Sequence, residues 1–462
     1  MDTKALRQKI LDLAIHGKLV PQDPNDEPAS VLLERIRAEK ERLIKEGKIK
    51  KGKKSAKTSD KPHYPFELPK GWCFTNIGEL LINRDGERKP VSSAIRSKQS
   101  NKIYEYYGAA GVIDKIDDYL FDEKLLLIGE DGANLLSKSK NNAFFAEGKY
   151  WVNNHAHVLD ATDKNLLEYV AIVINAIKLD DYITGSAQPK LSQDNLNKIP
   201  IVLPPLSEQK RIMEAIIHWS LLIEQIEQNK IDLQASIKQA KSKVLDLAIH
   251  GKLVQQDPND EPASELLKRI NPKAEIITDN GHYQKLPEGW TICKLKDICS
   301  KLVDGDHNPP KGTKETTEYL MLSAQNIVND NIVYTNGVRY LNHDAFETSD
   351  KRTKVMQGDL LITIVGTLGR SCVFSDNKKI TLQRSVACLT PLIYNHFLKY
   401  YMDSSSIQKY MTTNAKGTAQ KGFYLNQLEQ LPIMIPPLTE QQRIVARIEK
   451  IFARLDVIES AL

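Results

Sequence analysis

The stretch SEQKRIMEAIIHWSLLIEQIEQNKIDLQASIKQAKSKVLDLAIH, residues 207–250, decides how the rest of this chain is interpreted. Apolar residues recur along it in alternating steps of four and three, and only Lys230 interrupts the series. Its apolar members are Ile212, Ile216, Trp219, Ile223, Ile226, Leu233, Ile237, Ala240, Val244 and Leu247. Such a seam is typical of a coiled-coil helix. A Pro-Pro pair at 204–205 precedes it, Ser207 can cap its first amide groups, and Gly251 can end it. We therefore predict one helix, about 60 Å long, that acts as a spacer.

A second copy of this seam is divided between the two ends of the chain. Near the C-terminus, six apolar residues repeat the first six seam positions at an offset of 232: Ile444, Ile448, Ile451, Leu455, Ile458 and Leu462. The sequence LDLAIHGKLV occurs at residues 11–20 and again at 245–254, at an offset of 234. The terminal helices, laid end to end, would rebuild the central one. We predict a pseudo-twofold arrangement in which the rebuilt helix runs antiparallel to the intact helix, with Met1 and Leu462 close together.

Length and composition limit the class of protein. A chain of 462 residues is expected to form more than one domain. Its apolar runs are too short to span a membrane, and its charged first residues are unlike a signal peptide. The cysteines have no metal-ligand spacing, so we expect reduced thiols in a cytoplasmic protein; they are Cys73, Cys293, Cys299, Cys372 and Cys388. The net charge of +5 is weak evidence for nucleic acid, because the clustering of charge matters more than its total.

Two regions of mixed strands and helices precede the two copies of the seam. Each is entered through a similar motif, LPKGW at 68–72 and LPEGW at 286–290. Beyond these motifs the regions share a layout but little identity. Each has an apolar strand that runs into a glycine turn, a strand with polar residues at its start, a helix and a Gly-x-Ala-Gln loop. The paired segments are 125–132 with 360–369, 151–159 with 381–389, 166–179 with 394–411, and 185–188 with 417–420. A shared order of strands, helix and loop with little sequence identity is expected of two modules that recognise different targets.

Several motifs in combination resemble the specificity subunit of Type I restriction–modification enzymes, over essentially the whole chain. They are KILDLAIHGKLVPQDPNDEPAS at 9–30, the paired LP-x-GW motifs, the GSAQ and GTAQ loops, and PPL-[ST]-EQ-x-RI starting at Pro204 and Pro436. The resemblance implies an α+β fold in which two target-recognition domains are separated by a long antiparallel coiled-coil helix pair. The expected regions are an N-terminal helical region at 1–62, recognition domains at 63–206 and 273–438, a central helical region at 207–272 and a C-terminal helix at 439–462.

The same resemblance implies a function and partners. The chain would be a non-catalytic DNA-recognition subunit that reads an asymmetric bipartite site in double-stranded DNA, one half with each domain. Two modification subunits, which bind S-adenosylmethionine and methylate adenine, would dock on the helical regions. Restriction subunits, which use ATP and Mg²⁺ to cut DNA, would join them, so no cofactor is expected in this chain. The duplication independently favours two equivalent docking places, and a spacer of this length suits half-sites separated by about 34–36 Å or more.

Polar loop residues that can reach base edges or phosphates are the candidate DNA contacts. In the first region they are Arg84, Arg88, Lys98, Lys138, Asn154, Gln188 and Lys190. In the second region they are Thr367, Arg370, Gln383, Arg384, Gln420 and Lys421. The strongest candidates occupy matched positions: Gln188 with Gln420, and Asn154 with Arg384. An alternative for the two glutamines is that their shared loop makes only a structural turn.

Other interpretations remain open at this stage. Asp131, Glu147 and Lys149 match the minimal spacing of a metal-dependent nuclease, which would make the chain an enzyme, although such patterns often arise by chance. A coiled-coil scaffold that binds only proteins is the structural alternative. Asn308-Pro309-Pro310 is similar to part of the amino-methyltransferase motif, but Lys311 replaces its aromatic residue, so we interpret it as a loop. His155 and His157 alternate along a predicted strand and are interpreted as residues for packing and hydrogen bonding rather than as metal ligands, because no further ligand cluster accompanies them. Between Lys45 and Lys61, eight lysines suggest a solvated linker that adds non-specific attraction to phosphates.

Overall fold

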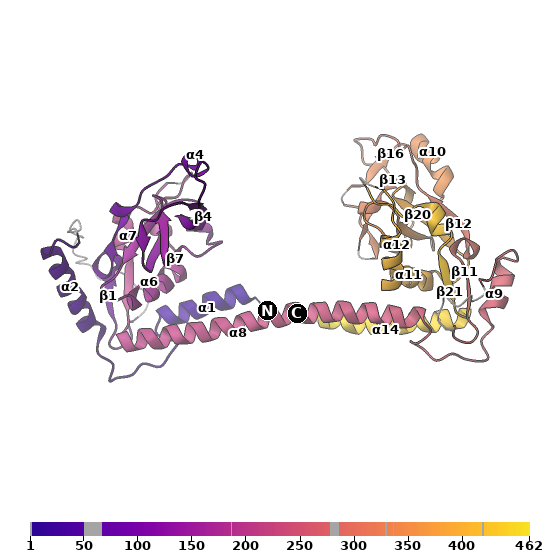
Figure 1. Cartoon of the computed structure of the whole chain (residues 1–462). Coiled ribbons are helices and arrows are strands. Elements are labelled where there is room, and N and C mark those ends of the chain that lie inside the picture. Colours follow the sequence, from indigo (N-terminus) through magenta and orange to yellow (C-terminus); the bar gives the residue numbers. More distant parts are fainter. Residues whose placement is uncertain are drawn as a thin grey trace. The chain divides into compact units, whose positions relative to one another are not determined.

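A single helix occupies the stretch that was predicted to form the spacer. This helix, α8 (Leu206–Ile249), contains 44 residues and is labelled in Figure 1. It begins directly after the Pro-Pro pair at 204–205. Gly251 follows it with a φ of +65°, and the amide of Lys252 donates back to the last turn at 2.8 Å, a termination that favours glycine. Ser207 is not the cap that we predicted, because the helix starts one residue earlier and includes Ser207 in its first turn.

The structure describes residues 2–49, 67–185, 187–277, 286–328, 330–335, 337–417 and 420–462 of a computed structural model. Most of the lysine run, and the predicted meeting of Met1 with Leu462, lie outside these residues. The chain divides into two units, Met1–Asn229 and Lys230–Leu462. Each unit contains one mixed region, which we call its head: residues 73–203 form the first head and residues 291–435 form the second.

In the first unit, two helices precede the head. They are α1 (Thr3–Ile15) and α2 (Ala29–Lys45). α1 lies along the first part of α8, where Arg7 pairs with Glu227 at 3.2 Å, and α2 packs its buried face into the same core as the head. Leucine and isoleucine at helical spacing provide that face, so burial of apolar surface holds the helix in place.

The described residues of the first head form three sheets. β1 (Cys73–Asn76) pairs antiparallel with β10 (Pro200–Leu203). A four-stranded sheet has the order β2 (Ile82–Asn83), β9 (Ala156–Asp160), β6 (Leu125–Gly129), β7 (Ala143–Ala146). A second has the order β4 (Gly111–Ile116), β3 (Tyr104–Gly108), β8 (Lys149–Val152), β5 (Phe121–Asp122), with β3 and β8 parallel. The helices of the head are α3 (Ile77–Leu80), α4 (Ser93–Arg96), α5 (Asn134–Ser137), α6 (Asn165–Ala176) and α7 (Gln193–Lys198), with 3₁₀ turns at Asp85–Glu87 and Asp180–Tyr182. Every residue of β6 is buried, which explains its uninterrupted apolar sequence.

The second unit repeats this plan. α9 (Ala263–Ile270) precedes the head, and α14 (Leu438–Ser460) lies along the second part of α8, where Lys241 contacts Asp456 at 2.6 Å (Figure 1). Its sheets are β11 (Thr291–Lys294) with β21 (Pro432–Ile435); β12 (Cys299–Asp304), β20 (Val386–Pro391), β17 (Leu360–Thr363), β18 (Ser371–Val373); β16 (Arg339–Leu341), β13 (Tyr319–Leu322), β19 (Lys379–Leu382); and β14 (Ile327–Val328) with β15 (Asn331–Ile332). Its other helices are α10 (His343–Thr353), α11 (Asn395–Asp403), α12 (Ser405–Thr413) and α13 (Leu425–Glu429), with 3₁₀ turns at Leu295–Ile298 and Ala324–Asn326.

In each unit, the same polar contacts join the border of the head to a helix, which is α8 in the first unit and α14 in the second. In the first unit, the indole Nε1 of Trp72 donates to the buried carboxylate of Glu208 at 2.9 Å, and Gln22 donates to the same carboxylate at 3.1 Å. In the second unit, Trp290 donates to Glu440 at 3.0 Å and Gln256 donates to it at 3.2 Å; these residues belong to the repeated motifs. An ion pair is repeated as well: Arg211 with Asp26, and Arg443 with Asp260, both at 2.6 Å. The internal duplication in the sequence therefore corresponds to matching contacts in the two units.

Three of the predicted elements are each divided in the structure. The predicted strands 151–159 and 381–389 are each two strands, β8 and β9 or β19 and β20, separated by a turn at 153–155 or 383–385. Here the chain passes from one sheet to another, although apolar residues continue on both sides. The predicted helix 394–411 is broken at Ser404, whose backbone is extended and whose hydroxyl donates to the carbonyl of Tyr401 at 2.7 Å.

The apolar seam of α8 is only partly covered within the described residues. Ile212, Ile223 and Ile237 are buried, whereas Trp219 and Leu233 are 43% and 40% exposed. Among the residues described, helices long and apolar enough for a membrane span do not occur. The five cysteines are present as free thiols.

Candidate nucleic-acid interface

Three segments of the first head come together at one end of its sheets. They follow β6 (residues 130–132), connect β8 to β9 (153–155) and precede α7 (the described part of 184–191). The backbone amide of Glu130 donates to the carbonyl of His155 at 2.8 Å, and Leu191 N donates to the carbonyl of Glu130 at 2.7 Å. Across the third segment, Thr184 and Lys190 exchange backbone hydrogen bonds of 2.9 and 2.8 Å. We call these three segments the first loop cluster.

The second head contains the same arrangement, the second loop cluster, formed by residues 364–370, 383–385 and the described part of 416–423. Ile364 N donates to the carbonyl of Ser385 at 2.9 Å, and Phe423 N donates to the carbonyl of Ile364 at 2.8 Å. Lys416 and Gly422 exchange two backbone bonds of 2.8 Å. These bonds correspond one for one to those of the first cluster. Since all of them involve backbone atoms, the framework can be kept while the side chains change.

The matched candidates lie in these clusters. Asn154 and Arg384 are exposed in the turns between sheets, and Gln188 and Gln420 are exposed in the Gly-x-Ala-Gln loops. Gly185 and its counterpart Gly417 have φ values of +86° and +109°. A Cβ on Gly185 would come within 2.6 Å of the carbonyl oxygen of Gln188, so the loop requires glycine for its turn. The shared sequence of the loop therefore has a structural explanation, and the glutamine side chains remain free to contact a ligand.

Most of the other candidates in the clusters are also accessible. Lys190, Thr367, Arg370 and Lys421 are exposed, and Gln383 is half-buried. Arg370 reaches the carbonyl of Ile327 at 3.4 Å through its guanidinium. Lys98 is exposed but follows α4, outside the cluster. The clusters therefore bring together eight of the thirteen candidates at exposed positions.

Three basic candidates are instead engaged within the first head. Arg84 contacts the carboxylates of Glu87 at 2.6 Å and of Glu123, and these hydrogen bonds raise the pKa of its guanidinium despite partial burial. Lys138 donates to the carbonyls of Asn175 and Ile177 at the end of α6, where burial lowers the pKa of its amine. Arg88 has a side chain only 12% exposed and belongs to a buried ion network.

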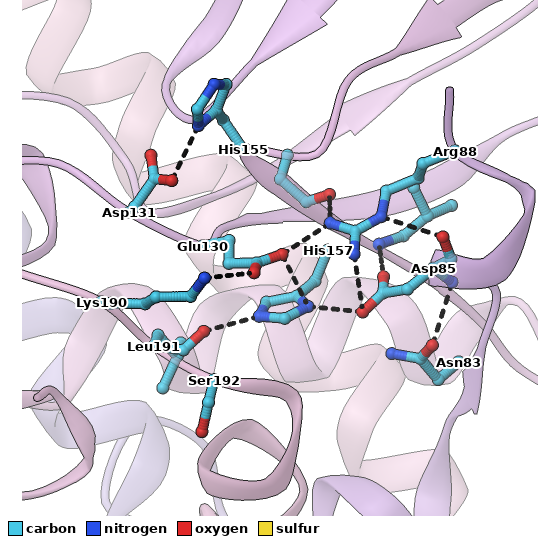
Figure 2. Close-up of polar contacts among 12 residues, drawn as sticks. Asn83, Asp85, Arg88, Glu130, Asp131, His155, His157, Lys190, Leu191 and Ser192 are labelled. Atoms are coloured by element: carbon cyan, nitrogen blue, oxygen red, sulfur yellow. Dashed lines mark hydrogen bonds and ion pairs between the residues drawn. The ribbon is translucent and has the colours of Figure 1, made fainter. Parts of the chain in front are cut away.

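Figure 2 shows this network, which includes Glu130 and Lys190 of the first loop cluster. Arg88 donates to Glu130 at 2.7 Å and to the carbonyl of Ala156 at 2.6 Å. His157, only 1% exposed, contacts Asp85 at 2.6 Å through Nδ1. Glu130 also pairs with Lys190 at 3.3 Å. Burial tends to raise the pKa of Asp85, but the hydrogen bond and charge of His157 and the charge of Arg88 hold that pKa below its ordinary value.

Asp85, Glu130 and His157 bring possible metal-ligand atoms within 4.8 Å of one another. Arg88, however, already supplies a positive charge to both carboxylates, so the donor set is satisfied by protein groups. Sequence reasoning missed this network, because its members lie far apart in the chain and Arg88 was selected as a DNA contact. In the sequence, the one feature that pointed to a buried ion network was the presence of polar residues within or beside apolar strands.

The residues of the proposed nuclease do not form one site. Asp131 follows β6, and its carboxylate contacts His155 Nδ1 at 2.7 Å. Glu147 follows β7, whose last residue, Ala146, pairs with Leu125 at the beginning of β6. Asp131 lies six positions after Leu125, two residues beyond the end of β6, which corresponds to about 20 Å of extended chain. The two carboxylates therefore lie near opposite ends of β6, too far apart to share a metal ion. His155 forms a hydrogen bond, as we predicted, but it is an exposed member of the loop cluster and not a packed residue.

Comparisons with known proteins place these clusters in a family. Residues 69–237 and 287–461 match the family model described as Type I restriction modification DNA specificity domain. The chain is 27% identical over 558 residues to the Type I restriction enzyme EcoEI specificity subunit of Escherichia coli, covering 99% of this chain and 90% of that protein. It is 32% identical over 376 residues to the EcoAI specificity subunit of the same organism, covering 64% and 62%. Among solved structures, the HsdS subunit from Thermoanaerobacter tengcongensis is 15% identical, with a TM-score of 0.49 and coverage of 86% and 93%. Each of the two matched segments contains one loop cluster.

Proposed function

The chain belongs to the Type I restriction modification DNA specificity family, so it recognises DNA sequence, and we propose that it reads an asymmetric bipartite site with one loop cluster on each half-site. The observation that carries this proposal is the comparison of the clusters. Their backbone hydrogen bonds correspond, while the exposed side chains differ, as in Asn154 against Arg384. Equivalent frames with unlike side chains are what two readers of different sequences require.

The exposed side chains of the clusters have suitable chemistry. Asn and Gln can form paired hydrogen bonds with adenine, and Arg can do so with guanine, each worth about 1–3 kcal/mol of discrimination. We assign base reading to Asn154 and Gln188 in the first head and to Arg384 and Gln420 in the second. Lys190, Thr367, Arg370, Gln383 and Lys421 are assigned to phosphates or flanking bases. Arg84, Arg88 and Lys138 are assigned to internal stabilisation, because acidic groups or carbonyls bind them at partly or largely buried positions; Lys190 pairs with Glu130 as well, but 54% of its side chain is exposed.

We further propose that the chain acts without catalysis of its own, in the cytoplasm, as part of a complex. Two modification subunits carrying S-adenosylmethionine would methylate adenine, and restriction subunits using ATP and Mg²⁺ would cut DNA. The repeated attachment of each head to its helix supports two equivalent docking places. The contacts of α1 and α14 with α8 support an antiparallel coiled-coil pair related by a pseudo-twofold axis. In this proposal, that pair fixes the distance between the half-sites.

Methylation mapping tests the proposal. The full chain is produced in cells with its modification subunits, and methylated adenines are located across the genome. We expect one motif made of two unlike halves separated by unspecified bases. In the double variant Asn154→Ala with Gln188→Ala, discrimination should fall about tenfold or more at one half only. The variant Arg384→Ala with Gln420→Ala should affect the other half.

Matched controls are Lys198→Ala on α7 and Lys409→Ala on α12, which are exposed residues outside the clusters. They should leave both halves unchanged. A continuous motif, or a change at both halves from variants in one cluster, would refute the assignment of one cluster to each half-site.

A further inference from the structure

The loop after β12 is joined to the second loop cluster through its backbone. β12 ends beside the start of β20, directly after the turn at 383–385. The amide of Asp306 donates to the carbonyl of Leu382 at 2.7 Å, and the amide of Arg384 donates to the carbonyl of Asp306 at 3.0 Å. We call residues 305–314 the proline loop, because they include the motif Asn308-Pro309-Pro310-Lys311. The proline loop therefore lies beside the turn that presents Arg384.

A glycine permits this close approach. A Cβ on Gly305 would come within 2.3 Å of the carbonyl oxygen of Leu382 and within 2.4 Å of that of Gln383, so the position requires glycine. In the first head, Asp85-Gly86 matches Asp304-Gly305, since each dipeptide follows the strand that pairs with β9 or β20. Nothing lies within 4 Å of a Cβ built on Gly86. The tight packing of this loop against a loop cluster thus distinguishes the second head from the first.

Several contacts restrict the conformation of the proline loop. One oxygen of the Asp306 carboxylate accepts from the amide of Asn308 at 2.8 Å, and the other accepts from the hydroxyl of Ser349 at 2.6 Å. The guanidinium of Arg339 donates to the carbonyl of Pro310 at 2.7 Å. The two adjacent prolines limit the backbone further. A segment that is ordered before binding loses less conformational entropy when it binds a ligand.

The side chains between these contacts face solvent. Asn308 and Lys311 are exposed, and among the residues that the structure describes neither side chain has a hydrogen-bond or ion-pair partner. His307 is 57% exposed and contacts Asp304 through Nε2 at 2.7 Å. Its counterpart in the first head, three positions after the matched aspartate, is Arg88, which belongs to the buried network. The second head therefore presents outward a loop whose counterpart is partly used for internal contacts.

The charges around the loop distinguish the roles of its two free side chains. Asp344, in the first turn of α10, lines the same hollow as Asn308, and its negative charge disfavours a phosphate there. Lys311 does not line that hollow. An asparagine can form paired hydrogen bonds with the edge of adenine, and a lysine binds a phosphate as a point charge. Asn308 therefore suits a base contact, and Lys311 suits a contact with the DNA backbone.

We propose that the proline loop is a fourth segment of the second loop cluster, in which Asn308 contacts a base edge and Lys311 contacts a phosphate. This inference rests on the function proposed above. Because the loop is hydrogen-bonded to the turn of Arg384, both contacts fall in the half-site that the second head reads. The motif that the sequence analysis interpreted only as a loop then supplies one base contact and one phosphate contact.

Changes of single base pairs test the role of Asn308. The full chain in complex with its modification subunits is titrated, by fluorescence anisotropy, with the mapped site and with sites that carry one changed base pair in the second half. In Asn308→Ala, the ratio of changed to intact Kd should fall about tenfold at one base pair. It should persist at the base pairs affected by Arg384→Ala or Gln420→Ala. Asn377→Ala is the matched control, because Asn377 is exposed at the opposite end of β19 from Gln383.

The dependence of binding on salt tests the role of Lys311. Lys311→Ala should weaken binding of intact and changed sites by the same factor, because a phosphate contact carries no sequence information. The slope of log Kd against log salt concentration should decrease by about one. Lys296→Ala is the matched control, because this exposed lysine precedes β12 whereas Lys311 follows it. Its salt slope should equal that of the wild-type chain.

Three results would overturn the inference: no base pair loses discrimination in Asn308→Ala, all base pairs lose it equally, or Lys311→Ala keeps the wild-type salt slope. An equal change of slope in Lys296→Ala would do the same. Thermal unfolding checks that the variants fold, and Asn308→Ser and Lys311→Gln replace an alanine variant that does not. If no changed base pair in either half affects binding by the wild-type chain, the proposed function itself fails, which is a different outcome.

Discussion

The two heads have nearly the same backbone frame but are stabilised differently beneath their loop clusters. In the first head, Glu130 and His157 join a buried ion network. In the second head, Ile364 and Ala387 occupy those places and are 1% and 0% exposed within an apolar core. Both solutions support loops with matching backbone hydrogen bonds. The comparison teaches that the backbone arrangement of the loop clusters is set by backbone hydrogen bonds and by the attachment of each head to α8 or α14. The buried residues behind the loop clusters can differ in polarity.

The attachments offer the strongest test of equivalence between the units. Replacing Trp72 or Trp290 by alanine removes a large buried side chain and leaves a buried carboxylate without its indole donor. We expect each change to destabilise its own head by about 3–5 kcal/mol. Hydrogen exchange read separately in each head is the appropriate measurement, because two units need not unfold together. Trp219→Ala, at an exposed position on α8, is the control. If the losses of stability caused by the two substitutions differed by more than roughly 2 kcal/mol, the two attachments would not be equivalent.

The buried network should make the first head more sensitive to loss of a single arginine. Arg88→Ala leaves Glu130 and Asp85 buried without their shared cation, so we expect a loss of about 2–4 kcal/mol. The matched change in the second head is Arg352→Ala. Its side chain is 48% exposed, and solvent screens the remaining charge of Asp304, so we expect about 1 kcal/mol or less. Urea denaturation monitored in each head measures both. If the two substitutions lowered stability equally, the buried network around Arg88 would stabilise its head no more than the contact of Arg352 with Asp304 stabilises the second head.

Acid should weaken both heads through the matched aspartates. Burial opposes ionisation of Asp85 and Asp304, but hydrogen bonds from His157 and from Arg352, respectively, with the nearby charges, lower the pKa of each carboxyl. A lowered folded-state pKa contributes stability above the unfolded-state pKa, and that contribution disappears as pH falls through the folded-state value. Asp85→Asn and Asp304→Asn should therefore flatten the acid side of the stability profile of their own heads. Unchanged acid slopes in both variants would contradict the assigned ionisation states.

The smallest expected effect concerns the repeated ion pairs at the start of each long helix. Arg211 with Asp26 and Arg443 with Asp260 have the same 2.6 Å contact, and both arginines are about one-third exposed. After allowance for solvent screening, each pair should contribute about 0.5–1 kcal/mol. Double-mutant cycles on the two pairs should give coupling energies that agree within about 0.5 kcal/mol. A coupling energy found in only one unit would show that the ion pair of the other unit does not contribute to stability.

Much of the fold was predictable because its signals are local and repeated. The period of the seam predicted the bounds of α8 to within one residue at each end. The duplicated motifs contain the residues that make matching contacts in the two units. The division of 151–159 into two strands was not predicted. Apolar residues continue through that segment, and passage from one sheet to another changes the hydrogen-bonding partners without changing the hydrophobic pattern. The helix break at Ser404 was also missed, since neither proline nor glycine marks it.

The candidate site was predictable only in part. Asn154, Arg384, Gln188 and Gln420, which we selected from matched positions, lie exposed in corresponding loops, and their contact with DNA stays a prediction. The internal engagement of Arg84, Arg88 and Lys138 could not be read from the sequence, because residue type does not distinguish a solvated cation from a paired one. His157 and Asp85 are 72 residues apart, so their contact depends on the pairing of β2 with β9, which periodicity alone does not specify.

The attachment of the first head has one more consequence. The contacts that are repeated in the second unit come from Gln22 and Asp26 before the head, Trp72 at its border, and Glu208 and Arg211 after it, and none of these side chains belongs to residues 73–203. Helix α2 also contacts the head directly: Lys40 donates to the carbonyls of Gly78, Glu79 and Leu81, and Arg37 pairs with Glu79. A genetic exchange with its endpoints at the two borders could therefore import an unrelated module and keep the repeated contacts, provided that the new module offers α2 and α8 an apolar surface of similar shape and offers Lys40 and Arg37 similar acceptors. New specificities would then arise by recombination in one step, without passing through unstable intermediates.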